Sequence, residues 1–257
     1  MKISIVIPTL NAARDLSATL AALEPAREGL VQETPARDAP MRNPMRDALI
    51  REVIVVDGGS ADGTPDLATA ARARVLTSPC GRGQQLRAGI AAARAKWLLL
   101  LHADTRLDPG WRDAALEHMR DHPGAAGYFR FALDSPDPRA RRLERLVAWR
   151  CRVLGLPYGD QGLLINRDTL EAAGGMRPLP LMEDVELIRR LRSRRLHIRL
   201  LNARAVTSAG KWERDGWYRR SARNLVCLSL WFLGVPPSRI ARLYESRIAR
   251  PEGCPRG

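Results

Sequence analysis

The chain has 257 residues, a hydrophobic fraction of 45% and a formal net charge of +14. That length suffices for one large core, and no apolar stretch reaches the roughly 18–20 residues that a transmembrane helix needs. Lysine occurs only at positions 2, 96 and 211, so arginine supplies most of the positive charge. The charge fits a phosphorylated ligand or an anionic membrane, and it also fits GC-rich codon usage with no partner. No nucleic-acid-binding motif occurs, so we expect no nucleic-acid partner.

The start of the chain is typical of a first strand rather than a signal peptide. The mainly apolar residues 3–7 lead directly to Pro8 and Asn11, without a small-residue cleavage site. The four cysteines, at positions 80, 151, 227 and 254, have neither metal-site nor CxxC spacing. We therefore expect a reducing, cytoplasmic setting.

Strands and helices alternate at short intervals through the first part of the chain. Apolar runs predict strands at residues 3–7, 52–56, 75–76 and 97–101. Helices are expected at residues 12–23, from 65 onward, at 83–95 and at 108–120. Thr9 or Asn11 is the expected cap of the first helix, and Thr64 that of the second. The alternation predicts a parallel α/β sheet with right-handed crossovers.

Two other regions depart from this pattern. Residues 24–50 contain four prolines and many charges without periodicity, which predicts a long surface loop or a partly disordered insertion. After residue 124, strands are expected at 127–133, at 162–165 and, once or twice, within 196–207. Helices are expected at 138–154, 183–194, 212–233 and 237–244. This second part predicts a mixed sheet.

Polar residues follow each of the four predicted parallel strands. They are Pro8-Thr9-Leu10-Asn11, the segment 57–64, Gly81-Arg82-Gly83 and His102-Ala103-Asp104. The carboxyl ends of parallel strands share one edge of a sheet, so these loops are expected to line one crevice. A carboxylate such as Asp104 can hold a divalent cation there, and the cation can hold a diphosphate. The order of the four loops indicates chemistry on a nucleotide-linked substrate.

With these motifs the chain resembles the family 2 glycosyltransferases, which have the GT-A fold. The resemblance covers residues 2–110 by motif order and continues through Asp160-Gln161-Gly162 and Met182-Glu183-Asp184 to about residue 245. Residues 102–106, 156–162, 179–187 and 206–214 are most similar to a bacterial subgroup. That subgroup is labelled radical-SAM/selenodomain-associated transferase 2, or arsenosugar-biosynthesis glycosyltransferase.

The resemblance implies an α/β fold with a Rossmann-like, mostly parallel sheet flanked by helices. A mixed-sheet acceptor half and C-terminal helices would complete it. Residues 1–245 would be a single domain, with a nucleotide-binding half at 1–110 and an acceptor half at 111–245. Residues 246–257 would be a flexible tail.

The resemblance also implies a nucleotide-sugar donor, with UDP as the expected nucleotide. Asp57 would face the uracil or ribose, because a carboxylate accepts N–H and O–H donors. Arg82 would offset diphosphate charge, or it is one more surface arginine. The residues expected around the donor are Pro8, Thr9, Asn11, Asp57, Gly58, Gly59, Arg82 and Asp104.

Asp104 matches the metal-binding aspartate of the family's Asp-x-Asp motif, so Mn²⁺ or Mg²⁺ is the expected cofactor. His102 replaces the first aspartate of that motif. An imidazole can bind Mn²⁺, or it can orient Asp104 as a purely structural residue, and both interpretations stay open. The metal would stabilise the departing diphosphate.

The pair Glu183-Asp184 matches the acidic residues that supply the family's catalytic base. Inverting transfer needs a carboxylate opposite the leaving group, and Asp184 is the expected base. Glu183 would position the acceptor or the base, although acidic residues also favour a helix start by themselves. Asp160 and Gln161 would contact the donor sugar or the acceptor, or form a polar turn.

Lys211 and Trp212 fall where the family closes its active site, so Lys211 could reach a phosphate and Trp212 could stack on a sugar. The Gln-x-x-Arg-Trp motif of processive synthases is absent. The Arg-rich helices around 139–152 and 217–232 could rest on an anionic membrane, at the inner face, or form solvated surfaces.

Two other functions remain as alternatives. A sugar-1-phosphate nucleotidyltransferase shares a related sheet, but its Gly-rich first loop is missing from residues 8–12. A noncatalytic basic protein that binds an anionic polymer or membrane would need neither Asp104 nor Asp184.

Overall fold

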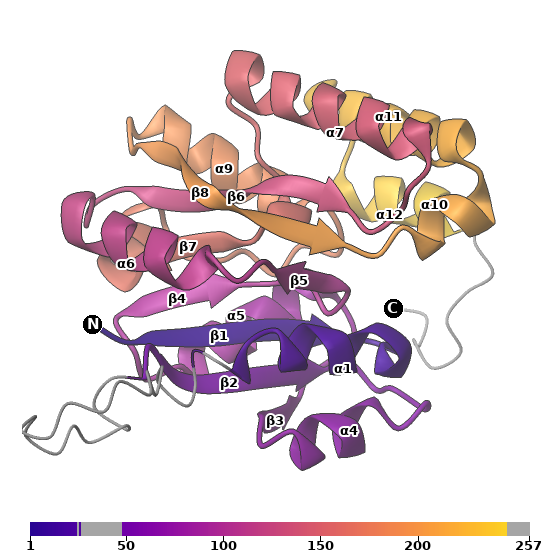
Figure 1. Ribbon diagram of the computed structural model, residues 1–257. Coiled ribbons are helices and arrows are strands. Elements are labelled where there is room, and N and C mark those ends of the chain that lie inside the picture. The colour runs from indigo at the N-terminus through magenta and orange to yellow at the C-terminus, as the bar shows by residue number, and fades with distance from the viewer. Residues whose placement is uncertain (25, 27–47, 246–257) are drawn as a thin grey trace, which may run out of the picture.

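The computed structural model describes residues 1–24, 26 and 48–245. Within them, one mixed sheet has the strand order β3-β2-β1-β4-β7-β6-β8-β5 (Figure 1). The strands are β1 (Ile3–Thr9), β2 (Ile50–Asp57), β3 (Arg74–Thr77), β4 (Trp97–Leu100), β5 (Thr105–Leu107), β6 (Ala126–Leu133), β7 (Leu163–Asn166) and β8 (Ile198–Thr207). This arrangement confirms the predicted α/β class.

Helices flank the sheet and cover its faces (Figure 1). They are α1 (Ala13–Ala21), α4 (Thr64–Ala70), α5 (Arg82–Ala92), α6 (Trp111–Asp121), α7 (Pro138–Trp149), α8 (Arg167–Ala172), α9 (Glu183–Ser193), α10 (Gly210–Asp215), α11 (Trp217–Phe232) and α12 (Pro237–Glu245). A π-helical turn, η1 (Arg150–Leu154), extends α7, and a 3₁₀ turn, η2 (Gly159–Gln161), precedes β7. No helix among the described residues combines the length and the apolar character that spanning a bilayer requires.

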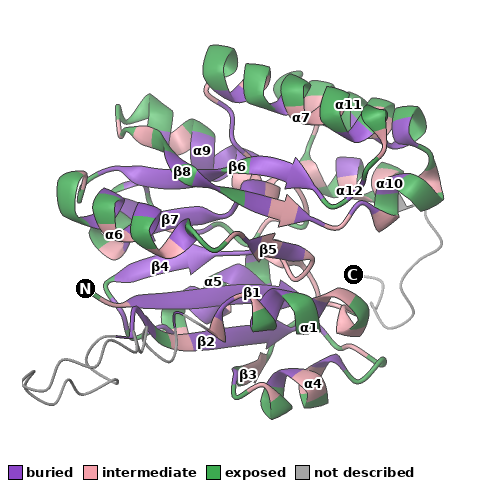
Figure 2. Ribbon diagram, viewed as in Figure 1, coloured by how far each residue is buried: buried purple, intermediate pink, exposed green. Residues whose placement is uncertain are grey.

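The strands β3, β2, β1 and β4 form a parallel half, as the apolar runs predicted. Every residue of β1 is buried, because helices cover both of its faces (Figure 2). Ile5 packs in the same core as Leu16 of α1, whereas Val6 packs with Leu86 of α5. The alternation along β1 thus serves two cores, one on each side of the sheet.

The rest of the sheet is mixed. Strand β7 runs antiparallel to both β4 and β6, β6 is parallel to β8, and β5 is antiparallel to β8. The segment 196–207 forms the single strand β8, and the sequence pattern did not indicate β5 or α8. The parallel half and this mixed half meet between β4 and β7.

The caps predicted for the first two helices are wrong. Helix α1 has no side-chain cap of its own; instead Ala12 N–H donates to Thr64 Oγ1 and Ala13 N–H to Asp62 Oδ2. Asn11 has a left-handed φ of 49°, and its side chain accepts a hydrogen bond from Ala61 N–H. Thr64 already lies inside α4, whose N-cap is Gly63. One loop, residues 60–64, therefore satisfies the starts of both helices.

Other helix boundaries also differ. The predicted helix 138–154 changes to the π-helical turn η1 at Arg150, and α5 ends at Ala92. The predicted helix 212–233 is divided into α10 and α11 at Gly216, where φ is 85°. Residues 25, 27–47 and 246–257, which include most of the predicted insertion and the predicted tail, lie outside the described residues.

Candidate active site

Asp57, at the end of β2, organises the loop that follows it. Its oxygens accept hydrogen bonds from Thr9 Oγ1, Gly59 N–H, Ser60 N–H and Ser60 Oγ–H. A carboxylate offers roughly four lone-pair sites, so these contacts use its acceptor capacity within the protein. The residue is only 4% exposed. The loop is consequently held in one conformation before any ligand binds.

The ends of β1 and β2 are joined by further contacts. Asn11 N–H donates to Ser60 Oγ, and Gly58 N–H donates to Thr9 O. Gln85, a buried residue of α5 that the sequence analysis missed, donates from Nε2 to Thr9 O at 2.7 Å and to Val56 O at 2.8 Å. A Cβ on Gly58 would lie 3.1 Å from the Gln85 amide nitrogen. A glycine at 58 therefore permits this close approach.

His102 and Asp104 follow β4. Asp104 Oδ2 accepts a hydrogen bond from Lys211 Nζ at 2.6 Å, which joins β4 to α10. Burial is the largest single influence and would raise the pKa of Asp104, but the surrounding groups, among which the Lys211 ammonium contributes most, together hold that pKa below its ordinary value. Burial, together with the nearby Arg82 charge, lowers the pKa of His102 to about 3. His102 is therefore neutral at physiological pH and keeps a nitrogen lone pair.

The acidic pair begins α9, but its two members have different surroundings. Glu183 is 1% exposed and accepts a 2.8 Å hydrogen bond from Arg82 Nε. Burial raises its pKa, although the Arg82 charge opposes this. The Asp184 side chain is 21% exposed, and its Oδ2 accepts Gly159 N–H at 2.7 Å. Arg82 Nη2 lies 3.7 Å from the same Asp184 oxygen. Arg82 thus connects α5 to both acids.

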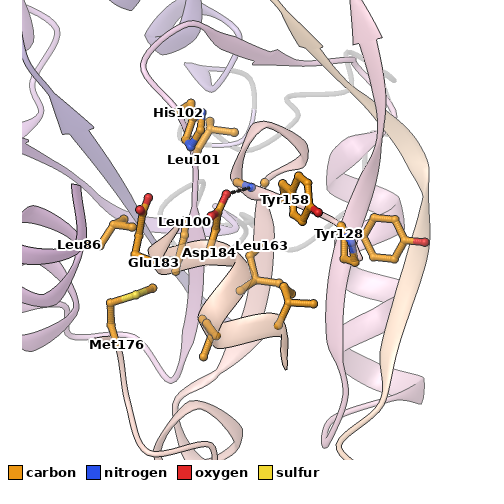
Figure 3. A pocket seen from close by; sticks show the side chains of 15 residues that line it. Leu86, Leu100, Leu101, His102, Tyr128, Tyr158, Leu163, Met176, Glu183 and Asp184 are labelled. Carbon is orange, nitrogen blue, oxygen red and sulfur yellow. Dashed lines mark hydrogen bonds between the residues drawn. The ribbon is translucent and has the colours of Figure 1, made fainter. Parts of the chain in front are cut away.

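Gly159, in η2, lies between the loop after β4 and the start of α9. A Cβ at this position would be 2.6 Å from His102 Nε2 and 3.0 Å from Asp184 Oδ2. In the close-up, the dashed hydrogen bond joins Asp184 to this turn, and His102 lies nearby (Figure 3). The two side chains can approach each other because the residue between them has no side chain.

A small cavity of about 30 Å³ lies beside these residues. Its lining is mainly apolar and includes Leu86, Leu100 and Met176, and the polar members are Tyr128, Tyr158, His102, Glu183 and Asp184 (Figure 3). The Tyr158 ring lies 3.7 Å from the Arg150 guanidinium, and burial raises the pKa of Tyr158 to about 12. Glu183 and Asp184 therefore lie beside a mainly apolar set of side chains.

The sequence profile described as glycosyl transferase family 2 matches residues 4–180 of the chain. The chain belongs to this family. It is a glycosyltransferase, and the site just described lies where its parallel and mixed halves meet. No curated protein matches it significantly.

Solved structures have the same fold. Glucosyl-3-phosphoglycerate synthase from Mycobacterium tuberculosis, in complex with Mn²⁺, UDP and glucosyl-3-phosphoglycerate, is similar with a TM-score of 0.52 and 20% identity. The match covers 78% of this chain and 70% of the synthase. S. aureus TarS matches with a TM-score of 0.55 and 16% identity, over 81% of this chain and 35% of TarS. A TarS fragment, residues 1–349, in complex with UDP has a TM-score of 0.53 at 16% identity, over 80% and 57% of the two chains.

Three residues expected near the sugar differ in their burial and in their hydrogen bonds. Asp160 has a buried Oδ1 without a hydrogen-bond partner, and burial raises its pKa to about 6. Gln161 is 2% exposed, and its amide contacts Phe129 O and Tyr158 N–H. Trp212 is buried against Phe131. Asp160 is therefore near the site with unused bonding capacity, whereas Gln161 and Trp212 support its walls from inside.

The donor groups can be compared with those that a divalent cation needs. The described residues contain no cluster of three or more His, Cys, Asp or Glu side chains that could hold a metal by themselves. Mg²⁺, however, is usually bound by one or two carboxylates together with substrate phosphates. Asp104 and the neutral His102 fit that partial set, and the Lys211 ammonium beside Asp104 Oδ2 shows that the carboxylate attracts a cation.

Proposed function

We propose that this glycosyltransferase transfers a sugar from a UDP-linked donor to an acceptor hydroxyl, with inversion at the anomeric carbon. The observation that carries the proposal is the convergence of Asp184, Gly159 and His102, with Asp104 two residues further along the chain. A carboxyl group that can serve as a base and a carboxyl group that can hold a cation thereby lie in one site, as metal-assisted sugar transfer needs. The complexes of similar folds with UDP and Mn²⁺ support the choice of nucleotide.

The donor would lie along the carboxyl ends of β1, β2 and β4. Pro8, Thr9, Asn11 and the loop of Asp57 would form the nucleotide pocket, whose shape the internal hydrogen bonds of Asp57 maintain. Because Asp57 uses its acceptor sites internally, it would contact a base or ribose only by exchanging one of these bonds. Gly58 and Gly59 would allow the backbone to approach the donor closely.

The diphosphate would be bound next to Asp104. Asp104 and His102 would hold a Mn²⁺ or Mg²⁺ ion, which when bound offsets the negative charge that builds on the departing diphosphate. Lys211 would leave its ion pair with Asp104 and bind a phosphate oxygen of the donor instead. Its side chain is flexible and 49% exposed, which permits this movement. Arg82, whose side chain is 41% exposed and whose charge already acts on His102 and Asp104, would add a second positive charge near the diphosphate.

Asp184 would act as the base. As the acceptor oxygen forms its bond to the anomeric carbon, Asp184 takes the hydroxyl proton, and the bond to the diphosphate breaks. Each carboxylate oxygen of Asp184 accepts one backbone N–H, from Gly159 and Val185, which orients the group and leaves room to accept a proton. Glu183, being buried, would act by orienting Arg82, and Asp160 would contact the sugar or acceptor.

The proposal extends to the radical-SAM/selenodomain-associated transferase 2 subgroup. The four stretches that carry this resemblance contribute His102 with Asp104, Gly159, Asp184, and Lys211. All of them border the site, and the contacts Asp104–Lys211 and Gly159–Asp184 join them in pairs. If the resemblance to the subgroup reflected only the fold, the residues of these four stretches would be expected to lie scattered over the molecule rather than around one site.

Calorimetric titration of UDP and GDP, with and without Mn²⁺, tests the proposal. UDP should bind more tightly than GDP, binding should strengthen with Mn²⁺, and Asp104→Ala should remove the metal dependence. Asp168→Ala, at an acid that is 71% exposed on α8, is the matched control and should bind as the native protein does. Absence of binding for both nucleotides under every metal condition would overturn the proposed function.

A further inference from the structure

Exposed apolar side chains are concentrated on one part of the molecule. Among the described residues, every large apolar side chain that is exposed, except Met1 and Leu200, lies in α7–η1, in α11 with the residue after it, or in α12. We define the apolar face by six of them: Leu146, Trp149, Val153, Leu225, Phe232 and Leu233. Their exposures range from 48% to 80%. Single apolar residues scattered over a protein surface are normal, whereas a concentration of them in one region marks an interaction surface.

The two helices that carry the apolar face run alongside each other. Near their starts, Arg139 of α7 lies 5.8 Å from the ring of Trp217 in α11. Near their ends, both contact α9: Arg192 donates to Leu154 O, and Arg189 lies 5.3 Å from the ring of Phe232. Figure 1 shows α7 and α11 along the same edge of the molecule, and Figure 2 shows their outer sides exposed. The stripes therefore belong to one surface.

Helical spacing gives each helix an exposed stripe. Leu146, Trp149 and Val153 recur at intervals of three and four residues on α7–η1. On α11, Leu225 and Phe232 are seven residues apart, which places them on one side. On the sides that face away from these stripes, Val147 and Cys151 of α7–η1 and Cys227 of α11 are buried. The exposed stripes are thus additional to the stripes that the fold needs for packing.

Arginines surround the apolar face. The segment from Pro138 to Leu154 contains six arginines and Glu144 as its only acid. Arg145, Arg152 and Arg219 are exposed and have no ion-pair partner among the described residues. Long arginine side chains can extend from an apolar surface to the headgroup level of a bilayer, and a tryptophan commonly lies at that boundary. This composition is that of an interfacial helix with a basic rim.

We propose that this protein docks on an anionic lipid bilayer through the apolar face, with α7–η1 and α11 lying in the plane of the interface. The charge of the face selects this occupant: a second copy of the chain would bring the same unpaired arginines, and another charge of +14, against it. Anionic headgroups instead complement the arginine rim, and the apolar side chains insert below it. The proposal concerns a surface outside the sugar-transfer site and does not depend on the donor.

Co-sedimentation of the full chain with vesicles tests this docking. Binding is expected to phosphatidylcholine vesicles that contain phosphatidylglycerol, and to be much weaker with phosphatidylcholine alone. The triple variant Leu146→Ser/Trp149→Ser/Val153→Ser should lower the partition coefficient about tenfold or more. Leu200→Ser, at an apolar residue that is 50% exposed on β8, is the matched control and should bind as the native chain does.

A charge variant tests the second half of the proposal independently. Arg145→Gln/Arg152→Gln/Arg219→Gln should also weaken binding about tenfold or more, since each basic residue near an anionic surface contributes about fivefold. Tryptophan fluorescence should shift to the blue on vesicle addition, and Trp149→Phe should remove most of that shift. Circular dichroism and UDP titration would verify that each variant keeps its fold.

Three outcomes would overturn the docking. One is no binding to the anionic vesicles. Another is binding that the arginine variant abolishes but the serine variant leaves intact, which would indicate attraction of a basic protein to any polyanion. The third is a dimer in sedimentation velocity that the serine variant converts to monomer, which would make the face a contact between two copies. Each is independent of whether UDP binds, so failure of the docking and failure of the proposed function are distinguishable.

Discussion

The two halves of the sheet hold their site residues in different ways. In the parallel half, the carboxylate of Asp57 is satisfied by Thr9 and by residues two and three positions further along the chain. Where the two halves meet, Asp184 depends on Gly159, and Asp104, which follows β4, depends on Lys211, 107 residues away in the chain. In the first arrangement most of the contacts are local and Thr9 adds one from β1, whereas every contact of the second joins segments far apart in the chain. We therefore expect changes in the two halves to separate nucleotide binding from turnover.

Removing the charge of Asp184 should give the largest effect. Asp184→Asn is expected to lower kcat about 10²–10⁴-fold, because the amide cannot take the acceptor's proton. UDP affinity should stay within about twofold of the native value, since the nucleotide pocket belongs to the parallel half. Steady-state kinetics and calorimetry measure the two quantities. Asp168→Asn should leave both unchanged; equal losses of UDP affinity and turnover in Asp184→Asn would contradict the separation.

A methyl group at Gly159 should disturb the contact between the halves. Its Cβ would lie 2.6 Å from His102 Nε2, so η2 or the imidazole must move. We expect kcat/KM to fall about 10–100-fold from misplacement of Asp184, and the free energy of unfolding to fall by about 1–3 kcal/mol. The control is Gly124→Ala, which meets no heavy atom within 4 Å. Kinetics of Gly159→Ala indistinguishable from those of Gly124→Ala would refute the assigned role.

Gln85 offers the converse test in the parallel half. Gln85→Leu removes two buried hydrogen bonds to Thr9 O and Val56 O, at a cost of about 1–3 kcal/mol in unfolding free energy. The Asp57 loop should loosen, so UDP binding should weaken about tenfold while kcat at saturating donor changes little. Gln84→Leu, at the exposed neighbouring residue, is the control. A fall in kcat with unaltered UDP affinity would reverse the assignment of the two halves.

His118, in α6, should affect stability alone. It is 3% exposed, and burial lowers its pKa, although its hydrogen bond to Ala125 O opposes this. Because the unfolded chain then binds more protons than the folded one, this contribution is fully present above about pH 6.5 and is lost as the pH falls below it. The free energy of unfolding, measured in denaturant between about pH 7.5 and about pH 5.5, should fall with falling pH, and His118 should account for at most about 1.4 kcal/mol per pH unit of that slope, to which the buried His102 also contributes.

His118→Gln should reduce that slope and leave kcat unchanged at neutral pH. His197→Gln, on the surface, should keep the slope of the native protein. The same pH dependence in the native protein and in His118→Gln would show that this histidine does not contribute.

Much of the parallel half could be predicted because its signals are local. The strands β1, β2 and β4 each contain a short apolar run, and a polar loop follows each of them. In contrast, β5 has three residues and exists because it pairs with β8, where the hydroxyls of Thr105 and Thr207 are 3.0 Å apart. No local pattern marks such a strand. Gln85 left a weak signal, as a polar residue four positions before Gly89 on the buried side of α5.

The sequence motifs did not indicate which of the expected site residues would be buried. Trp212 and Gln161 both have side chains that can bind sugars, yet packing against Phe131 and hydrogen bonds to the backbone place them in the interior. Asn11 has a residue type that caps helices, but its contacts to Ser60 and Ala61 fix it in a left-handed conformation instead. These outcomes depend on which segments meet.

The sequence by itself determined the family and the α/β class, because periodicity and short motifs encode them over a few residues, and the roles expected of the residues at the strand ends stay predictions. Only the tertiary structure decided that Lys211 contacts Asp104, that Gly159 separates His102 from Asp184, and that the stripes of α7 and α11 form one surface. Those relations join segments far apart in the chain. They follow from how two cores pack on either side of one sheet, which no local pattern contains.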